Sequence, residues 1–224
     1  FNLSEMSETI MAMTIDPVVL IDFDTVQDSL GSWDDQDEDS LSWEFSDSIT
    51  YGQSPYALYL YGNTWKTMEI SPFQVSNGHV WQVAVFSDGD SEIQAFGVGD
   101  SVNTLIYSFA GTQELDIEEW VTVYQGNFPD DQWNLYQLPI ADDWFAWYDY
   151  YPLIETLIFI NDDDGGEPGE VFFDYLVDLT DVLPVPPAVA IEYDVGNIYR
   201  SNGIRQVDIQ FHSDVVDPDT YSHD

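Results

Sequence analysis

Short apolar runs separated by polar, glycine-containing turns extend along most of the chain, and this pattern is typical of β-strands. Two of the strongest runs, residues 156–160 and 170–179, are separated by an acidic, glycine-rich turn. Further strands are expected at residues 18–24, 41–45, 56–61, 65–70, 80–86, 93–98, 104–109, 120–124 and 133–138. Because short strands recur at intervals of about 8–12 residues without a sustained helical period, the sequence predicts an all-β sandwich.

A proline-rich segment divides the chain at residues 182–187, where consecutive prolines favour an extended linker. Before it we expect an N-terminal arm at residues 1–17 and the sandwich at residues 18–181. Residues 188–224 follow as a β-strand extension that is too short to bury a core of its own. This extension is either the start of a truncated second domain or an arm that docks elsewhere.

Asp174 occupies an unusual position, because in a regular strand it shares a face with Phe172 and Leu176. A buried carboxylate without a partner costs several kcal/mol. The chain contains only three Lys and Arg residues, so backbone N–H groups or a metal ion are the expected partners of Asp174.

Asp22 and Asp24 repeat this oddity in the expected first strand, where they share a face with Val18 and Leu20. Carboxylate and carbonyl oxygens are the ligands that Ca²⁺ prefers. We therefore predict a structural Ca²⁺ site that includes Asp22, Asp24 and Asp174. The alternative is that these acids occupy edge or bulge positions that face water.

Four aromatic residues recur at helical spacing between the last two expected strand pairs: Trp144, Trp147, Tyr148 and Tyr151. Aromatic rings stack on sugars because one face of a pyranose ring is apolar, so these residues are candidates for a carbohydrate-binding platform. Aromatic residues at this spacing also commonly cap a hydrophobic core, and both readings stay open at this stage.

The composition excludes several classes of function. The net charge is −40, with 43 acidic and 3 basic residues among 224, so the chain lacks the cations that nucleic acids or anionic membranes require. Self-repulsion of this size needs screening by salt or bound divalent cations. No apolar run is long enough to span a membrane. The hydrophobic content of 44% predicts a packed core.

The first residue is Phe1, so we interpret the chain as a processed product or a fragment, and we expect an extracellular or cell-surface location. There is no nucleophile elbow, phosphate-binding loop or zinc motif. Glu118 and Glu119 are compatible with a glycosidase pair, but carboxylates are so frequent that pairs arise by chance. We therefore predict a protein that is not an enzyme.

Four short motifs, at residues 19–24, 81–85, 133–139 and 172–175, resemble those of the jelly-roll carbohydrate-binding modules, a galactose-binding-like group. The resemblance covers residues 18–181 and implies a jelly-roll sandwich. It also implies a structural Ca²⁺ between an acid of the first strand and the aspartate of the last, which match Asp24 and Asp174. Residues 187–224 resemble the opening strands of an Ig-like, PKD-type domain.

Two functions are consistent with these features. The first is a structural subunit that assembles with copies of itself, for example into a filament, by strand exchange through its terminal arms. In that hypothesis Val207, Ile209 and Phe211 form an apolar row that a neighbouring subunit covers. The alternative is a carbohydrate-binding module of a secreted multidomain protein, with a polysaccharide as partner.

Overall fold

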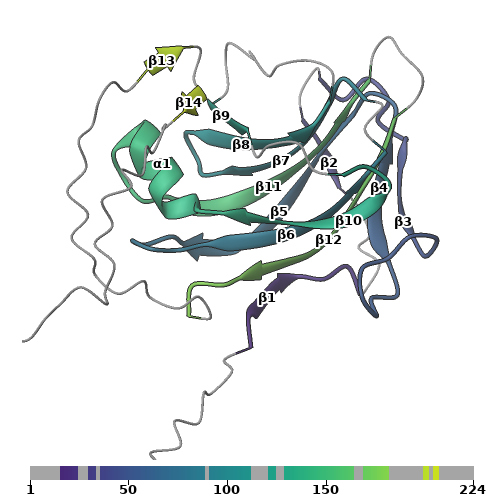
Figure 1. Cartoon of the computed structure of the whole chain (residues 1–224), viewed down its shortest axis with the longest axis horizontal. Helices are drawn as coiled ribbons and strands as arrows, with labels where there is room; N and C mark the ends of the chain where they lie inside the picture. Colours follow the sequence, from purple (N-terminus) through teal and green to yellow (C-terminus); the bar gives the residue numbers. More distant parts are fainter. Residues whose placement is uncertain are drawn as a thin grey trace, which may run out of the picture.

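The protein is a two-sheet β-sandwich with one short helix (Figure 1). A computed structural model describes residues 16–24, 30–33, 36–88, 91–111, 121–124, 129–163, 169–181, 199–201 and 204–206, the segments 121–124, 199–201 and 204–206 by their backbone alone. The first sheet has the strand order β10-β6-β12-β4-β3, and β1 also pairs with β12. The second sheet has the order β2-β5-β11-β7-β8-β9.

The strands of the first sheet are β1 (Val18–Ile21), β3 (Trp43–Ser46), β4 (Ala57–Tyr61), β6 (Trp81–Ser87), β10 (Gln132–Leu138) and β12 (Glu170–Asp178). The strands of the second are β2 (Gly31–Ser32), β5 (Thr64–Gln74), β7 (Ile93–Gly99), β8 (Thr104–Ala110), β9 (Val121–Tyr124) and β11 (Leu153–Asp162). All pairings within the two sheets are antiparallel except that of β8 with β9. The chain passes repeatedly from one sheet to the other, and the prediction of a jelly-roll sandwich is confirmed.

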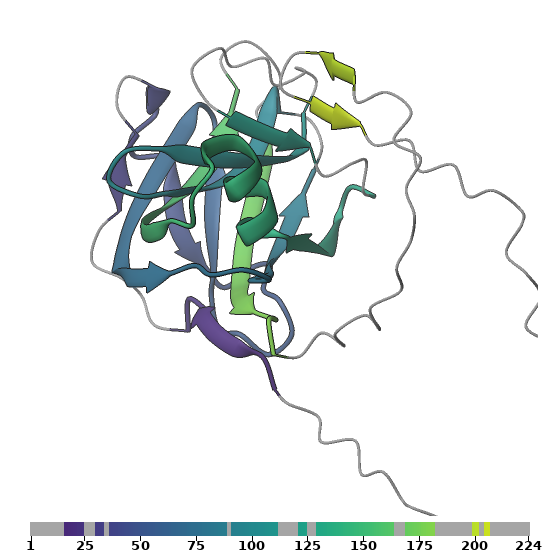
Figure 2. The ribbon, with the colours of Figure 1, turned by 90° about the vertical axis from the view of Figure 1, so that its left-hand side faces the viewer.

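The core forms between the two sheets, because successive side chains of a strand point to opposite faces and every second one points inward. Leu58 and Leu60 of β4 and Val83 and Val85 of β6 are fully buried there. Phe159 of β11 packs on them from the opposite sheet, in the same apolar cluster. Figure 2 views the sandwich from the end at which the helix lies, so the helix stands in front of the strands.

The facing of β12 differs from the regular alternation expected from the sequence. Val171 and Phe173 face the core, and the register shifts between Asp174 and Val177. Tyr175 has a positive φ of 47°, which is unusual for a bulky residue. Because of this bulge Leu176 joins Val171 and Phe173 in the core, whereas a regular strand would place it on the opposite face, with Asp174.

The helix α1 (Ile140–Tyr148) follows β10 and closes one end of the sandwich (Figure 1). Its first turn carries two acids, Asp142 and Asp143, which complement the partial positive charge of a helix N-terminus. The helix ends at Asp149, which adopts a left-handed conformation. No helix among the described residues is long and apolar enough to cross a membrane.

Beyond residue 181 the structure describes a hairpin of β13 (Tyr199–Ser201) and β14 (Ile204–Gln206). The hairpin lies beside β9, at the edge of the second sheet (Figure 1). β13 and β14 are the described parts of the β-strand extension predicted at residues 188–224. The rest of that extension, and with it most of the segment that resembles an Ig-like domain, falls outside the described residues.

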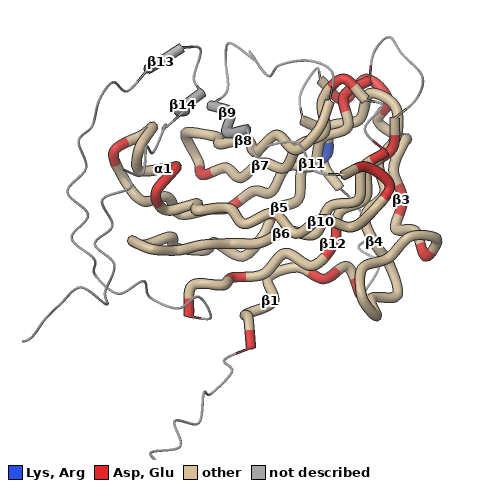
Figure 3. Tube along the Cα trace, in the orientation of Figure 1, with Lys and Arg blue, Asp and Glu red and all other residues tan. Residues whose placement is uncertain are grey.

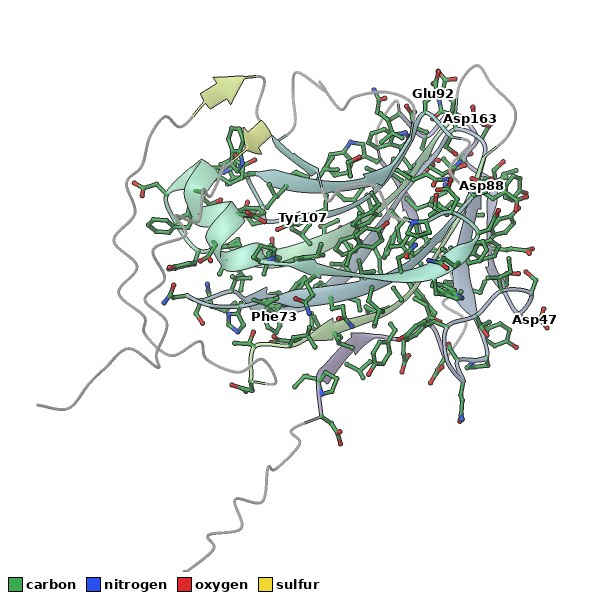
Figure 4. The ribbon with its side chains drawn as sticks, in the orientation of Figure 1. Asp47, Phe73, Asp88, Glu92, Tyr107 and Asp163 are labelled. Carbon is green, nitrogen blue, oxygen red and sulfur yellow. The ribbon has the colours of Figure 1, made fainter. Side chains whose placement is uncertain are left out.

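Charge is distributed very unevenly. Figure 3 shows acidic residues mainly along the loops of the described chain. Lys66 is the one basic residue whose side chain the structure describes. Figure 4 shows Asp88, Glu92 and Asp163 at the end of the sandwich away from α1. Asp88 Oδ2 accepts a hydrogen bond from the N–H of Glu170 at 2.8 Å, and Asp163 Oδ2 accepts one from the N–H of Gly169 at 2.8 Å. These two acids therefore stabilise the loops on which they lie.

Candidate functional site

An open groove of about 390 Å³ lies where the end of α1 meets the β7–β8 turn. Tyr150 and Tyr151 enter it because the chain reverses at Asp149 after the helix and then begins β11 at Leu153. Polar side chains from three further segments complete the lining: Gln74 from β5, Asp100, Ser101 and Asn103 from the turn, and Glu155 from β11. The groove thus combines two phenol rings with carboxylate and amide groups.

Hydrogen bonds hold the turn and Tyr150 in place. Asp100 Oδ1 accepts the N–H groups of Val102 at 2.8 Å and Asn103 at 2.7 Å, and thereby closes the turn. The Tyr150 hydroxyl donates to Asp100 Oδ2, and Asn103 Nδ2 donates to the Tyr150 hydroxyl at 3.0 Å. The Tyr150 ring is therefore fixed on the groove wall before any ligand arrives.

Two groups in the groove keep free hydrogen-bonding capacity. No hydrogen bond or ion pair from the described residues engages the Glu155 carboxylate, which lies beside the register shift between Ile154 and Thr156. Gln74 donates its amide N–H groups to the carbonyls of Val75 and Pro152, which leaves its oxygen to accept. Both groups suit a ligand that donates O–H bonds.

Two tyrosines at the groove, Tyr148 and Tyr150, have raised pKa values and stay neutral at physiological pH. Burial raises the pKa of Tyr148 to about 12, and its hydroxyl donates to the carbonyl of Thr104 at 2.6 Å. Burial also raises the pKa of Tyr150, and the hydrogen bond to Asp100 adds to the effect. These phenols therefore supply uncharged rings and hydroxyls.

The predicted aromatic platform is wrong for one of its four members. Trp144 is fully buried beneath the helix, so its ring is closed to a ligand. Trp147 and Tyr148 are half-buried and pack against the core, and Tyr151 lines the groove. Tyr150 was missed. Its position directly after the helix was the available signal, but its partner Asp100 lies 50 residues away in sequence.

A second aromatic group lies on the outer face of the first sheet. Tyr59, Phe172, Phe86 and Trp133 occupy matching positions on four adjacent strands. The rings of Tyr59 and Phe172 stack on each other with centroids 4.5 Å apart, and Phe172 is only 3% exposed. The ring of Phe172 is therefore closed to a ligand.

The structure brings Asp24 and Asp174 together around Ser54. Ser54 Oγ lies 3.0 Å from Asp24 Oδ1, 3.1 Å from the carbonyl of Asp22 and 2.7 Å from the carbonyl of Tyr56. A hydroxyl has one proton, so it cannot donate to all three acceptors at once. The result is an oxygen-rich cluster with fewer donors than acceptors.

Asp174 lies on this cluster and is fully buried. Its oxygens accept the N–H groups of Tyr175 at 2.8 Å and Tyr51 at 3.2 Å. Burial nevertheless raises the pKa of Asp174 to about 6, and the nearby Asp24 contributes in the same direction. The backbone donors therefore compensate only part of the cost of burying this carboxylate.

The side chain of Asp22, which the sequence predicts as a Ca²⁺ ligand, does not join the cluster around Ser54. Its side-chain Oδ1 accepts the N–H of Asp24 at 3.2 Å, so only its carbonyl joins the cluster around Ser54. The positive φ of Phe23, 51°, turns this residue into the core and leaves Asp24 exposed. Among the described residues, no group of three or more His, Cys, Asp or Glu side chains is arranged to hold a metal ion.

The residues predicted for assembly, Val207, Ile209 and Phe211, lie outside the described residues. Their role stays a prediction. The backbone that leads to them ends at Gln206 of β14.

No family model matches the chain, and no curated protein matches it. Among solved structures, it is similar to a family 30 carbohydrate-binding module of a cellulosomal cellulase of Clostridium thermocellum, with 15% identity, coverage of 73% of this chain and 97% of that chain, and a TM-score of 0.46. It is also similar to a family 11 carbohydrate-binding module from Clostridium thermocellum in complex with a mixed-linked tetrasaccharide, with 14% identity, coverage of 72% and 94%, and a TM-score of 0.42.

Proposed function

We propose that this protein is a non-enzymatic, extracellular module that binds a neutral carbohydrate in the groove beside Tyr150 and Tyr151. The observation that carries the proposal is the composition of that groove, in which two tyrosines lie next to acceptors from Glu155 and Gln74. Sugars present an apolar ring face together with several hydroxyl donors, and such a lining complements both.

The charge of the site supports a neutral ligand over an acidic one. Asp100 and Glu155 are the charged residues of the lining, and both are acids. The only Lys or Arg side chain among those that the structure describes is Lys66, which is buried. A uronic-acid or sulfated polysaccharide would bring further negative charge to an already acidic surface.

Retention on immobilised polysaccharides tests the proposal. Tyr151→Ala and Glu155→Ala should each weaken retention on a neutral polysaccharide at least tenfold, because the first removes an aromatic ring and the second removes hydrogen-bond acceptors. Tyr61→Ala is the matched control, since Tyr61 is an exposed tyrosine of the other sheet. A polyuronate serves as the charged comparison. Unchanged retention in both groove variants would contradict the proposal.

We also propose that the cluster around Ser54 holds a structural Ca²⁺. Asp24, Asp174 and the carbonyls of Asp22 and Tyr56 supply hard oxygen ligands of the kind that Ca²⁺ prefers. The excess of acceptors over donors at this cluster supports a cation there. Binding to the folded state alone would raise stability by mass action, so addition of a chelator should lower the melting temperature.

Self-assembly is the second candidate function. The observation that favours it is an exposed strand edge, that of β1, which lies beside an apolar groove on the side of the sandwich away from β9.

A further inference from the structure

A second groove, of about 470 Å³, opens between the two sheets along β1 and β5. Its lining is largely apolar and includes Ile21, Met68, Phe73, Trp81, Leu157 and Leu176. Phe73 is labelled in Figure 4, on the side of the sandwich where β1 lies. The groove is separate from the carbohydrate site, because no residue lines both.

The strand β1 leaves one edge unpaired among the described residues, since it pairs only with β12. Val18 is 58% exposed and Val19 is 44% exposed, so apolar side chains accompany this free edge. Unpaired main-chain groups are a template for an added strand. β1 therefore offers both hydrogen bonds and apolar contacts to an extended polypeptide.

The edge of β5 on the opposite side of the groove is less suited to pairing. β2 covers it only at Lys66 and Thr67. Beyond them Glu69 and Pro72 lie where the register with β11 is interrupted, and both residue types are used to block edge pairing. An added strand should therefore join β1 and direct its apolar side chains toward the groove.

Trp81 supplies an independent observation. The side chain is fully buried and lines the groove, and its Nε1 has no hydrogen-bond partner in the described structure. A buried N–H without an acceptor costs about 1–3 kcal/mol. A main-chain carbonyl of an inserted segment is a suitable acceptor for it.

The chain itself contains a segment of the required chemistry. In residues 207–211 the apolar side chains of Val207, Ile209 and Phe211 alternate with Asp208 and Gln210, so an extended conformation places the three on one face. The segment follows directly on β14, which lies beside β9.

The same molecule is poorly placed to fill its own groove with this segment. β8, β7 and β11 separate β9 from β5, which corresponds to about 19 Å at the usual spacing of strands. Five extended residues span about 17 Å. The segment would be used up in crossing the sheet and would leave nothing to pair with β1. A second copy has no such constraint.

We propose that the groove between β1 and β5 receives residues 207–211 of a second copy of this chain, which add to β1 as an edge strand. β14, after which the donor segment follows in the sequence, and the acceptor strand β1 lie at opposite sides of the sandwich (Figure 1). A contact between different surfaces does not close on itself unless the rotation permits, so the association propagates head to tail. Glu69 is the one charged residue of the groove, but the net charge of −40 makes association dependent on salt.

Two single substitutions test the junction in the full-length chain. Val19→Asp blocks the acceptor and Ile209→Asp blocks the donor. Wild-type protein in 1 M salt should form polymers, measured by light scattering and electron microscopy, and each variant alone should be monomeric. Leu135→Asp is the matched control for the acceptor, because Leu135 is 41% exposed on β10 and lies outside the groove. Gln210→Asp is the control for the donor, since it adds the same charge on the opposite face.

Mixing the two variants provides the decisive measurement. The donor of Val19→Asp and the acceptor of Ile209→Asp are both intact, so one junction forms and the mixture should give a heterodimer of 1:1 composition. A synthetic peptide of residues 204–213 should bind wild-type protein and shift its tryptophan emission, and Val19→Asp should weaken this binding at least tenfold. Monomeric wild-type protein at high concentration and 1 M salt, or polymers that persist in both variants, would overturn the proposal. Binding of the groove to an unrelated peptide in preference to residues 204–213 would also overturn it.

Discussion

Two buried aspartates in the same sandwich illustrate two ways of accommodating a carboxylate. The side chain of Asp37 is fully buried, and its Oδ2 lies 2.5 Å from the Nζ of Lys66. Asp174 is equally inaccessible, but the donors that the structure gives it are the N–H groups of Tyr51 and Tyr175 and the hydroxyl of Ser54. Only Asp174 lacks a nearby cation within the described structure.

The paired aspartate anchors a loop, whereas the aspartate without a cation has a raised pKa. Lys66 also donates to the carbonyl of Ser40 at 2.7 Å, and the N–H of Trp65 donates to Asp37 Oδ1 at 3.1 Å, so the pair ties the 36–42 loop to β5. Around Asp174, burial raises the pKa to about 6. The comparison shows that a chain with three basic residues has little means of neutralising a buried acid except an external cation or a proton.

The largest expected effect comes from removing the internal cation. Lys66→Met leaves the buried Asp37 carboxylate unpaired, and we expect a loss of about 3–5 kcal/mol in the free energy of unfolding, measured with urea. The double variant Lys66→Met, Asp37→Leu should recover most of the loss, because it removes the orphaned charge as well. A loss in the single variant below about 1 kcal/mol would indicate that water reaches Asp37.

The opposite sign is expected at the other aspartate. In the presence of a chelator at pH 7.5, Asp174→Asn removes the buried charge but also one of the two oxygens that accept backbone N–H groups, so the net gain in the free energy of unfolding should stay below about 1 kcal/mol. With Ca²⁺ the same variant should lose the gain in melting temperature that the wild type shows. Equal responses of the two proteins to Ca²⁺ would argue against a metal site that includes Asp174.

The pH dependence sharpens the comparison further. The pKa of Asp174 rises from 3.8 to about 6 on folding, so the folded state binds the proton more tightly. The stabilisation is therefore complete below about pH 4 and is lost as the pH rises through 6, with a change of about 1 kcal/mol between pH 5 and 7. The difference between the wild type and Asp174→Asn, measured in chelator by thermal unfolding, isolates this group from other acids. At saturating Ca²⁺ this stability difference should instead increase with pH, since the cation favours the ionised carboxylate.

The smallest effect is expected at Ser54. Ser54→Ala removes a donor that faces Asp24 and two carbonyls, which should cost about 0.5–1 kcal/mol without Ca²⁺. Ser48→Ala is a control on the same loop region, because its hydroxyl bonds only with that of Ser46 in the described structure. A stabilising effect of Ser54→Ala would show that the hydroxyl crowds the cluster.

The sequence by itself located most elements of the sandwich. The expected strands at residues 80–86, 93–98 and 104–109 match β6, β7 and β8 within one residue at each end. A short, mostly apolar run between polar turns predicts such strands, and this run is a local property of the sequence. β7 and the middle of β8 are in fact buried on both faces. The position of Asp174 inside an apolar stripe was also readable, and its complete burial is confirmed.

The interactions of the functional residues were decided by the tertiary structure. A bulge at Tyr175 changed which side chains of β12 face the core, and a single positive φ is not encoded in a hydrophobic pattern. Trp144 and Tyr150 are alike in the sequence as aromatic residues near one helix, yet the first is buried and the second lines a groove. The partners of Tyr150, Asp174 and Lys66 come from 50, 123 and 29 residues away. Burial and charge pairing depend on such distant neighbours, so a pattern along the chain predicts where a strand runs but not what its side chains meet.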